Sequence, residues 1–376
     1  MYLKDTEVCP GAAAKPAHQD CTLSALSEIR FIMKILCFGA GAIGSYIAGS
    51  LALIGNPLIY VEQPRFIANL KENGVRIEDI NGEMHHLKRF DAYGSAEEAF
   101  ARHDDIDLVI TAVKGFNTDD VIKALKPFAD KVPAILSLQN GVENEAKYAA
   151  AFGEDKVIPC SICTAISRGE QGSIKVAKLR GMGIADTHPI CETLVRECCE
   201  AGLKAKLMTD GLAMKWSKMI SNLLSNAASA IFDMSPAEVF ADPDGFSLEI
   251  RQLKETMAVM KALGISPVNI PGVPIKLLCW AVKYLPGFLT RPILVKAVGG
   301  GRGSKMPSFY IDLHAGRKES EVEFLNGAVV RYGDSLGIST PVNQAYYEVL
   351  TKLAAGDLPL DTYKKAPKKF LGEAVH

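Results

Sequence analysis

Residues 34–44, KILCFGAGAIG, decide the fold of the amino-terminal half of the chain. A short apolar run leads into Gly39-Ala40-Gly41-Ala42-Ile43-Gly44, and a helix-like segment follows to residue 53. A GxGxxG motif alone is weak evidence. In the order strand, glycine loop, helix, however, it provides a tight turn, a bare backbone beside a pyrophosphate and a helix N-terminus directed at its charge. The sequence therefore predicts that residues 39–44 bind a dinucleotide.

The end of the next predicted strand bears on which dinucleotide is bound. Residues 57–61 form that strand, and it ends at Glu62. An acid at this offset accepts hydrogen bonds from the ribose 2′-hydroxyl of NAD and repels the 2′-phosphate of NADP. Arg65, three residues further on, would have the opposite effect. The sequence leaves NAD and NADP both open.

Further strands continue the alternating α/β pattern. Residues 75–80 and 84–87 flank Asn81-Gly82, which predicts a type I′ hairpin. The buried-strand runs 107–113 and 134–138 end at Lys114 and at Gln139-Asn140-Gly141. Ligands of open parallel sheets bind beyond the carboxyl ends of the strands. Lys114 and Asn140 are therefore placed to contact cofactor or substrate, although polar residues after a strand are also ordinary in loops.

Composition excludes several classes of protein. The 376 residues are 48% hydrophobic and 23% charged, which is typical of a soluble globular enzyme with two domains. A balance of 42 basic and 43 acidic side chains gives no overall field for nucleic acid or an anionic membrane, although a local patch can hide in a neutral total. No apolar run reaches the ~20 residues of a spanning helix, so stable membrane insertion is not expected.

Residues 1–32 and the cysteines carry no functional pattern. The first 32 residues lack periodicity and precede a natural start at Met33, so we expect a peripheral extension; a functional arm is the alternative. The nine cysteines are most simply reduced thiols in the cytosol. Cys160 and Cys163 form a lone CxxC motif with apolar neighbours, which favours two buried thiols over a redox or zinc site. No metal is predicted.

The segment 211–232 is predicted to form one largely buried helix with a polar stripe. It has no acidic residue, and its polar side chains recur at steps of three or four: Lys215, Lys218, Asn222, Ser225, Asn226 and Ser229. Such a stripe faces water or a polar cavity, and amides and hydroxyls favour the cavity. The stripe suits carbonyl reduction, because Lys218 can donate a proton to a developing alkoxide while Asn222 and Asn226 hold the substrate's oxygens.

Taken together, these motifs resemble the ketopantoate reductase (2-dehydropantoate 2-reductase) family, within the 6-phosphogluconate-dehydrogenase-like group. The match runs from about Met33 to about Ala355 and rests on five ordered motifs: MKI with GAGAIG, TAVK, QNG, WSKMISNLLSN, and Pro307-Ser308 followed by SEVEFLNG. The resemblance implies a Rossmann domain, here residues 33–208, and an α-helical substrate domain, residues 209–376. It also implies a cleft where NADPH passes hydride to the C2 carbonyl of a 2-oxo acid.

The resemblance also implies roles for single residues. Lys218 is similar to the family's proton donor, and Asn222 and Asn226 to its substrate-binding asparagines. Glu321 is similar to the glutamate that binds the substrate hydroxyl, and Ser308 to the serine near the substrate carboxylate. Asn140 and Lys114 match positions that contact the nicotinamide end and the cofactor.

Two local departures from the family pattern keep alternatives open. The spacing from Asp312 to Glu321 is one residue longer than is usual, which leaves Glu319 as a substitute. Glu62 stands where NADPH enzymes tend to offer a basic residue nearby.

A third departure is a basic insertion at about residues 270–306. From residue 256 to 311 there is no acid, but there are seven bases: Lys261, Lys276, Lys283, Arg291, Lys296, Arg302 and Lys305. The apolar part predicts one or two helices broken at Pro286, followed by a glycine run at 299–303. We consider three hypotheses: a hinge that brings Arg302 to an anionic substrate, a solvated helical hairpin, and a membrane-surface or dimer-contact helix.

The sequence thus predicts NAD(P)H-dependent reduction of a 2-oxo acid to a 2-hydroxy acid, with ketopantoate to pantoate as the first reaction to test. A different oxo acid at the same site is one alternative. A nucleotide-binding regulator that has lost turnover is another. A homodimer is compatible with the sequence, whereas no nucleic-acid partner is expected.

Overall fold

The fold is described from a computed structural model, which covers residues 31–169, 173–302 and 306–375. The predicted extension at residues 1–32 lies almost wholly outside these described residues. In one helix, α12, the side chains of residues 293 and 296–302 are also outside the description.

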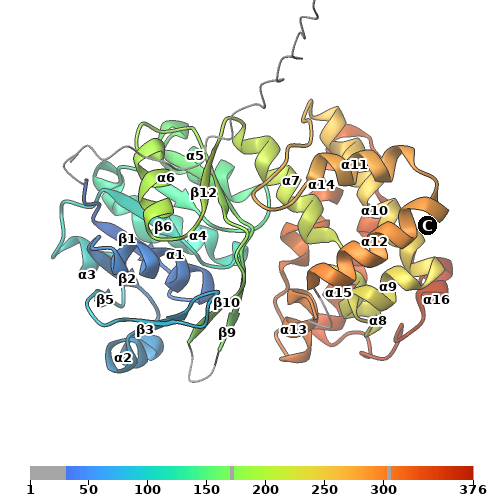
Figure 1. The fold of residues 1–376 in the computed structure, drawn as a ribbon, viewed down its shortest axis with the longest axis horizontal. Helices are drawn as coiled ribbons and strands as arrows, with labels where there is room; N and C mark the ends of the chain where they lie inside the picture. The colour runs from blue at the N-terminus through green and yellow to red at the C-terminus, as the bar shows by residue number, and fades with distance from the viewer. Residues whose placement is uncertain (1–30, 170–172, 303–305, 376) are drawn as a thin grey trace, which may run out of the picture. The chain divides into compact units, whose positions relative to one another are not determined.

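The amino-terminal part is built on an eight-stranded sheet of order β12-β11-β8-β7-β6-β1-β2-β5 (Figure 1). Its strands are β1 (Ile35–Phe38), β2 (Leu58–Val61), β5 (Asp91–Tyr93), β6 (Leu108–Thr111), β7 (Ile135–Ser137), β8 (Val157–Ile162), β11 (Met182–Ala185) and β12 (Ala205–Met208). All neighbours pair in parallel except β11 and β8, which are antiparallel. β1 is fully buried because its side chains alternate between two apolar clusters, one on each face of the sheet.

Helices cover both faces of this sheet, as a doubly wound fold requires. They are α1 (Ala42–Leu53), α2 (Pro64–Asn73), α3 (Ala96–Phe100), α4 (Thr118–Leu125), α5 (Asn144–Phe152) and α6 (Cys191–Glu200), with short 3-10 turns η1 (Gly115–Asn117), η2 (Lys126–Lys131) and η3 (Glu154–Lys156). Residues of α1 and α6 share one apolar cluster, and residues of α3, α4 and α5 share the other.

A second, four-stranded sheet packs on α1, and its existence is not evident from the sequence. Its order is β4-β3-β10-β9, with β3 at Val75–Glu78, β4 at Met84–Leu87, β9 at Ala165–Arg168 and β10 at Ile174–Lys178. Gly49 of α1 permits the contact, because an added Cβ would lie 3.3 Å from Ile77 Cδ1 and 3.4 Å from Val75 Cγ1.

The hairpin between β3 and β4 is confirmed, but its predicted turn type is wrong. β3 and β4 pair antiparallel, with Val75 opposite Leu87. A type I′ turn needs positive φ at both central residues, whereas in this turn only Gly82 has it, at 86°. The Asp79 carboxylate accepts hydrogen bonds from the amides of Asn81 and Glu83, at 2.8 Å each. These bonds hold the turn in a geometry other than type I′.

The carboxy-terminal part is helical, which confirms the predicted class of α/β domain followed by an all-α domain. Its helices are α7 (Gly211–Leu223), α8 (Asn226–Phe232), α9 (Pro236–Ala241), α10 (Pro243–Ala262), α11 (Ile275–Tyr284), α12 (Gly287–Arg302), α13 (Ser308–His314), α14 (Asn326–Leu336), α15 (Pro341–Ala355) and α16 (Pro367–Glu373), with a 3-10 turn η5 (Glu321–Phe324). Phe232, Tyr346 and Phe370 pack ring on ring in its core, with centroids 5.3–6.4 Å apart. The boundary between residues 208 and 209 stays a prediction.

The single helix predicted for residues 211–232 is wrong, because the chain breaks between α7 and α8. Ser225 adopts a left-handed conformation with φ 54°. The freed backbone groups bind side chains of α10: the Ser225 amide donates to Glu249 Oε2 at 2.6 Å, and the Leu223 carbonyl accepts from Gln252 Nε2 at 3.2 Å. The predicted polar stripe is therefore not continuous, and Ser225 and Ser229 are fully buried.

The basic insertion forms two helices, as predicted. α11 ends at Tyr284 and α12 begins at Gly287, so the break falls at Pro286. The glycines at 299–301, which the sequence suggested as part of a hinge loop, lie in α12. Residues 303–305 and the side chain of Arg302 lie outside the description, so the hinge hypothesis for Arg302 stays a prediction. Within the described ranges, no helix is both long and apolar enough to cross a bilayer.

Candidate functional site

The glycine loop between β1 and α1 is shaped for a pyrophosphate. Gly39 has φ 94°, and a Cβ added to Gly44 would lie 1.9 Å from the Gly39 carbonyl oxygen, so both positions require glycine. Gly41 is the N-cap of α1, and no side chain caps that helix. A Cβ on Gly41 would meet no heavy atom within 4 Å. Open space thus lies beside uncapped amides at the N-terminus of α1, which fits the phosphates of a dinucleotide.

This geometry predicts that Gly41→Ala impairs cofactor binding without loss of stability. Gly41 has φ −70°, which alanine adopts freely, and the added methyl meets only open space. In the complex the same methyl would occupy the place of a phosphate, so we expect the Kd for the nicotinamide cofactor to rise about tenfold or more. Fluorescence titration and thermal denaturation measure the two quantities. A variant that binds the cofactor normally would contradict this placement.

Glu62 is held at the end of β2 by two backbone amides. Its Oε2 accepts from Ala40 N and its Oε1 from Gln63 N, both at 2.8 Å. The carboxylate therefore has a fixed place beside the glycine loop. Arg65, in contrast, is exposed on α2, and its guanidinium lies 4.7 Å from the ring centre of Phe66.

Lys114, which follows the end of β6, contacts two carboxylates of the carboxy-terminal helical part. Its ammonium forms an ion pair with Glu321 of η5 and lies 3.6 Å from Asp312 Oδ2 of α13. Burial acts to lower the pKa of Lys114, but the two carboxylates prevail and raise it, so the side chain stays cationic. Glu321 is 6% exposed, whereas Glu319 is exposed on the surface, so the structure places Glu321, not Glu319, in this group.

A second contact joins the strand end at Asn140 to α7. Asn222 Nδ2 donates to Asn140 Oδ1 at 3.0 Å. The neighbouring Gln139 is buried, and it fixes this loop by donating to Thr118 Oγ1 at 2.8 Å and by accepting from Tyr148 Oη at 3.0 Å. Asn140 itself is exposed and presents its side chain at the surface of the site.

Lys218 lies one turn before Asn222 on α7 and is half-buried. Burial raises the pKa of the Cys163 thiol, which directly follows β8, and the positive charge of Lys218 opposes this shift. Because residues four apart share a helix face, Lys218 and Asn222 present their side chains on the same side of α7.

Asn226 and Ser308 form the third pair of predicted site residues. The Asn226 side chain and Ser308 Oγ are 3.4 Å apart, and the Phe309 amide donates to Asn226 Oδ1 at 3.1 Å. Asn226 is buried and Ser308 is exposed. Asn226 therefore holds the start of α13 and so positions Ser308.

Lys215, the first member of the polar stripe, faces away from any open site. It is 4% exposed, and its Nζ lies 2.6 Å from the Gln139 carbonyl, 3.3 Å from the Cys160 carbonyl and 2.7 Å from Glu145 Oε1. These contacts anchor α7 to the loop after β7, to β8 and to α5. Cys160 and Cys163 are free and buried, as predicted.

Asp312 entered the sequence analysis only as a spacing reference for Glu321, and its contact with Lys114 was not predicted. It lies between Lys114 and Arg317, with Arg317 Nη1 2.7 Å from Asp312 Oδ1. Nothing in the local sequence signals this role, because the Lys114 partner is almost two hundred residues away.

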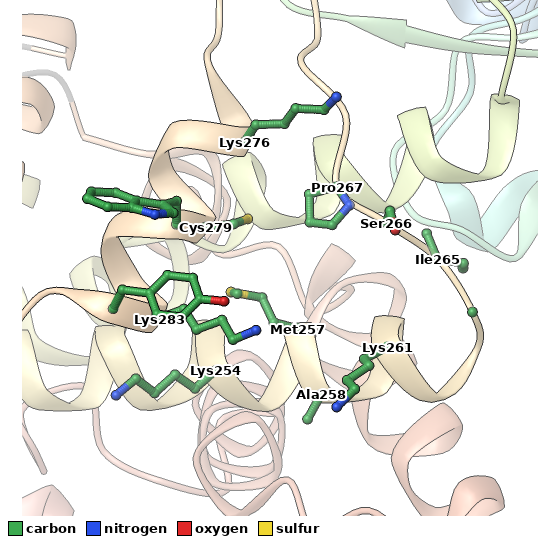
Figure 2. A pocket seen from close by; sticks show the side chains of 13 residues that line it. Lys254, Met257, Ala258, Lys261, Ile265, Ser266, Pro267, Lys276, Cys279 and Lys283 are labelled. Carbon is green, nitrogen blue, oxygen red and sulfur yellow. The ribbon is translucent and has the colours of Figure 1, made fainter.

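The larger of two described cavities lies elsewhere, between α10 and α11 (Figure 2). Its volume is about 750 Å³, and four lysines line it: Lys254, Lys261, Lys276 and Lys283. None of the predicted site residues contributes to this cavity.

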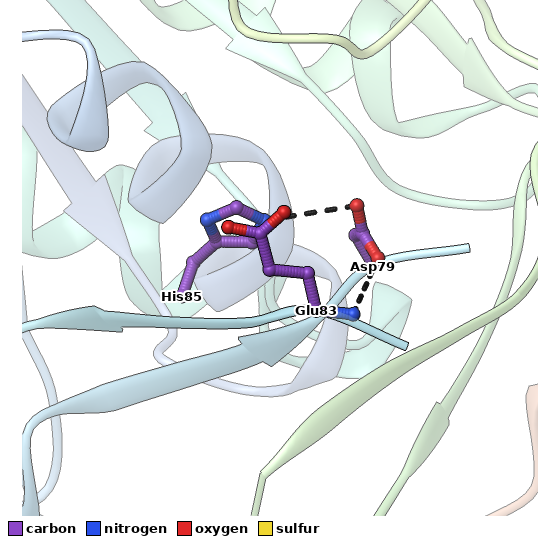
Figure 3. A group of neighbouring side chains, drawn as sticks. All are labelled: Asp79, Glu83 and His85. Carbon is purple, nitrogen blue, oxygen red and sulfur yellow. Dashed lines mark hydrogen bonds and ion pairs between the residues drawn. The ribbon is translucent and has the colours of Figure 1, made fainter. Parts of the chain in front are cut away.

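Asp79, Glu83 and His85 form a group whose ligand atoms lie within 4.8 Å of one another, at the turn between β3 and β4 (Figure 3). The Asp79 carboxylate is engaged there by the turn amides, and His85 Nε2 lies 3.8 Å from its Oδ2. The turn amides and His85 therefore account for the position of the Asp79 carboxylate.

Comparison with known proteins covers both parts of the chain. Residues 35–188 match the family Ketopantoate reductase PanE/ApbA, and residues 210–354 match Ketopantoate reductase PanE/ApbA C terminal. The 2-dehydropantoate 2-reductase of Aquifex aeolicus is 26% identical, over 86% of this chain and 96% of its own length. That of Pyrococcus horikoshii is 25% identical, over 83% and 94%.

Solved structures share the fold. A PanE/ApbA family ketopantoate reductase from Ralstonia eutropha JMP134 superposes with a TM-score of 0.73 at 24% identity, covering 86% of this chain and 99% of that one. A D-mandelate dehydrogenase with NADH and anilino(oxo)acetate superposes with a TM-score of 0.68 at 20% identity, covering 88% and 99%. With both family matches in sequence order, the chain belongs to the ketopantoate reductase family of oxidoreductases.

Proposed function

We propose that the protein reduces a 2-oxo acid to a 2-hydroxy acid with a nicotinamide cofactor, with ketopantoate as the first candidate substrate. The observation that carries this proposal is the meeting of two strand ends with polar residues of the helical part. Lys114 pairs with Glu321, and Asn140 pairs with Asn222. The proposed domains, residues 33–208 and 209–376, would supply the cofactor and the substrate side of one site.

In this proposal each polar group has one task. The bound cofactor supplies the hydride. Lys218 donates a proton to the carbonyl oxygen as negative charge develops on it, and Asn222, one turn away, orients that oxygen by hydrogen bonding. Ser308, held by Asn226, donates to the substrate carboxylate.

Glu321 would accept a hydrogen bond from a substrate hydroxyl. Its carboxylate is buried and is held by the Lys114 ammonium, so its position is fixed before the substrate arrives. Asn140 and Lys114 are proposed to contact the nicotinamide end of the cofactor, and Arg302 to contact the substrate carboxylate.

The test is to follow the nicotinamide absorbance of the purified protein with NADH and with NADPH, against ketopantoate and a panel of 2-oxo acids that includes bulkier and aryl members. Turnover of ketopantoate supports the proposal. Turnover of another oxo acid alone would keep the reaction class and change the substrate. Cofactor binding without oxidation by any oxo acid would favour a regulator.

We further propose that NADH is the preferred cofactor. Two amides fix the Glu62 carboxylate where the adenosine ribose lies in this fold, and Arg65 is turned to Phe66. A fixed negative charge accepts hydrogen bonds from a 2′-hydroxyl and repels a 2′-phosphate.

Glu62→Gln tests this preference. The glutamine amide keeps one acceptor, which can serve Ala40 N but not also Gln63 N, and it removes the charge. We therefore expect the ratio of kcat/KM for NADPH to that for NADH to rise about tenfold, the size of a short-range repulsion near the surface. Glu97→Gln, an exposed change on α3, is the matched control. A wild-type protein that prefers NADPH, or an unchanged ratio in the variant, would refute the role of Glu62.

A further inference from the structure

The cavity between α10 and α11 is a cationic pocket with no acidic lining. This cavity is here called the lysine pocket, because four lysines line it. They are Lys254 and Lys261 on α10 and Lys276 and Lys283 on α11. Figure 2 shows them on the two facing helices, around Met257 and Cys279. All four are exposed, and none forms an ion pair with a carboxylate of the described residues. Such uncompensated positive charge is suited to a phosphate-bearing partner.

Exposed apolar side chains, here called the apolar ridge, follow the chain from α11, where Trp280 and Tyr284 also line the lysine pocket, to the first turn of α12. The ridge consists of Leu277, Trp280, Tyr284, Phe288 and Leu289. The first three recur at steps of three and four on α11, while Ile275, Cys279 and Val282 of the same helix are buried. Phe288 is 76% exposed, and Leu277 and Tyr284 are each 61% exposed. α11 is therefore apolar on its core side and also on its outer side.

We propose that the apolar ridge and the lysine pocket together bind the surface of an anionic phospholipid membrane. Leucine and phenylalanine side chains enter the boundary between headgroups and acyl chains, and tryptophan and tyrosine lie at that boundary with one polar end in water. The lysines lie on one side of the ridge, around the pocket, where they would contact lipid phosphates, and each contributes attraction to an anionic leaflet. Lys283 Nζ, 4.8 Å from the Tyr284 ring centre, places charge directly beside the ridge.

Charge decides between a membrane and a second copy of the chain. A symmetric dimer built on this face would bring the lysine pocket of one copy towards that of the other. From residue 256 to 311 the chain has no acidic residue that could compensate this repulsion. An anionic lipid surface supplies the compensating charge, and its acyl region supplies a place for the apolar ridge.

The experiment is co-sedimentation of the full chain with phosphatidylcholine vesicles, and with vesicles that also contain about a third phosphatidylglycerol. We expect binding to the anionic vesicles only, weakening as salt is added. Trp280 is exposed and Trp216, the other tryptophan, is buried, so a blue shift of tryptophan emission on binding reports on the ridge. Equal binding to both vesicles, or to neither, would overturn the proposal.

Variants separate the two parts of the surface. Lys276→Glu with Lys283→Glu should lower the partition coefficient about 25-fold or more, since each lysine near an anionic surface contributes about fivefold and the new carboxylates are repelled. Lys352→Glu with Lys368→Glu changes the same charge at exposed lysines of α15 and α16 and should leave binding unchanged. Leu277→Ser with Phe288→Ser should abolish the blue shift and weaken binding to anionic vesicles. All these positions are exposed, so thermal denaturation should show that the fold survives.

Two further measurements identify other occupants. If soluble glycerol phosphate changes Trp280 emission without vesicles, the lysine pocket serves a free phosphate ligand and the membrane proposal fails. If the protein without lipid is a dimer that Leu277→Ser with Phe288→Ser converts to a monomer, the ridge serves a second copy and the proposal also fails. The proposal is independent of the oxo-acid reductase activity, so failure of one leaves the other untouched.

Discussion

Replacing Lys218 by alanine is expected to lower kcat by a factor of ~10² or more, the usual contribution of a general acid. Lys218 shares a face of α7 with Asn222, whose amide reaches Asn140 at the end of β7. No other lysine of α7 can replace it, because the ammonium of Lys215 is engaged by two carbonyls and a carboxylate. The measurement is steady-state oxidation of the nicotinamide cofactor at saturating oxo acid.

The cofactor Kd of the Lys218→Ala variant should stay within about twofold of the wild-type value, because the glycine loop is untouched. Lys352→Ala, an exposed lysine of α15, is the matched control and should retain full activity. A near-normal kcat for the Lys218 variant would remove this residue from the mechanism. A loss that affects KM alone would assign it to substrate binding.

Replacing Lys215 by alanine is expected to lower the free energy of unfolding by about 3–5 kcal/mol, the range measured when one partner of a buried ion pair is removed. The change leaves the Glu145 carboxylate, 13% exposed, without its cation, and the carbonyls of Gln139 and Cys160 without their donor. Urea denaturation measures the loss.

Lys147→Ala is the control for this stability effect. Lys147 also pairs with a carboxylate, that of Asp119 at 2.9 Å, but at the surface, where such pairs contribute at most about 1 kcal/mol. If Lys215→Met combined with Glu145→Leu regains part of the lost stability, the uncompensated charge is the cause. Equal losses for Lys215→Ala and Lys147→Ala would contradict the buried pair.

The elements that sequence predicts well are those specified by neighbouring residues. The glycine loop needs only residues 34–53, and its strand, turn and helix appear as expected. Lys114 and Asn140 follow buried apolar runs, so their place at strand ends is a local property of the chain. The family resemblance identified site residues that local sequence patterns cannot assign, such as Glu321.

The elements that sequence missed depend on contacts between distant residues. The break at Ser225 has no proline or glycine to signal it, and its backbone groups are satisfied by Glu249 and Gln252 of α10. The geometry of the turn at Asn81-Gly82 is set by hydrogen bonds to the Asp79 carboxylate, and not by the preference of the Asn-Gly dipeptide for a type I′ turn. Asp312 meets Lys114 only in the folded chain.

The pairs Lys114–Glu321 and Asn140–Asn222 carry a consequence for affinity. Each of these four side chains already has a polar partner within the site. A ligand that engages them exchanges one set of polar contacts for another, so its binding free energy is the small difference between two large terms. Removing one member of a pair frees its partner, and the same substitution can therefore tighten the binding of one ligand while it weakens that of another. Selectivity among oxo acids would then be set by competition with the protein's own side chains as much as by the shape of the site.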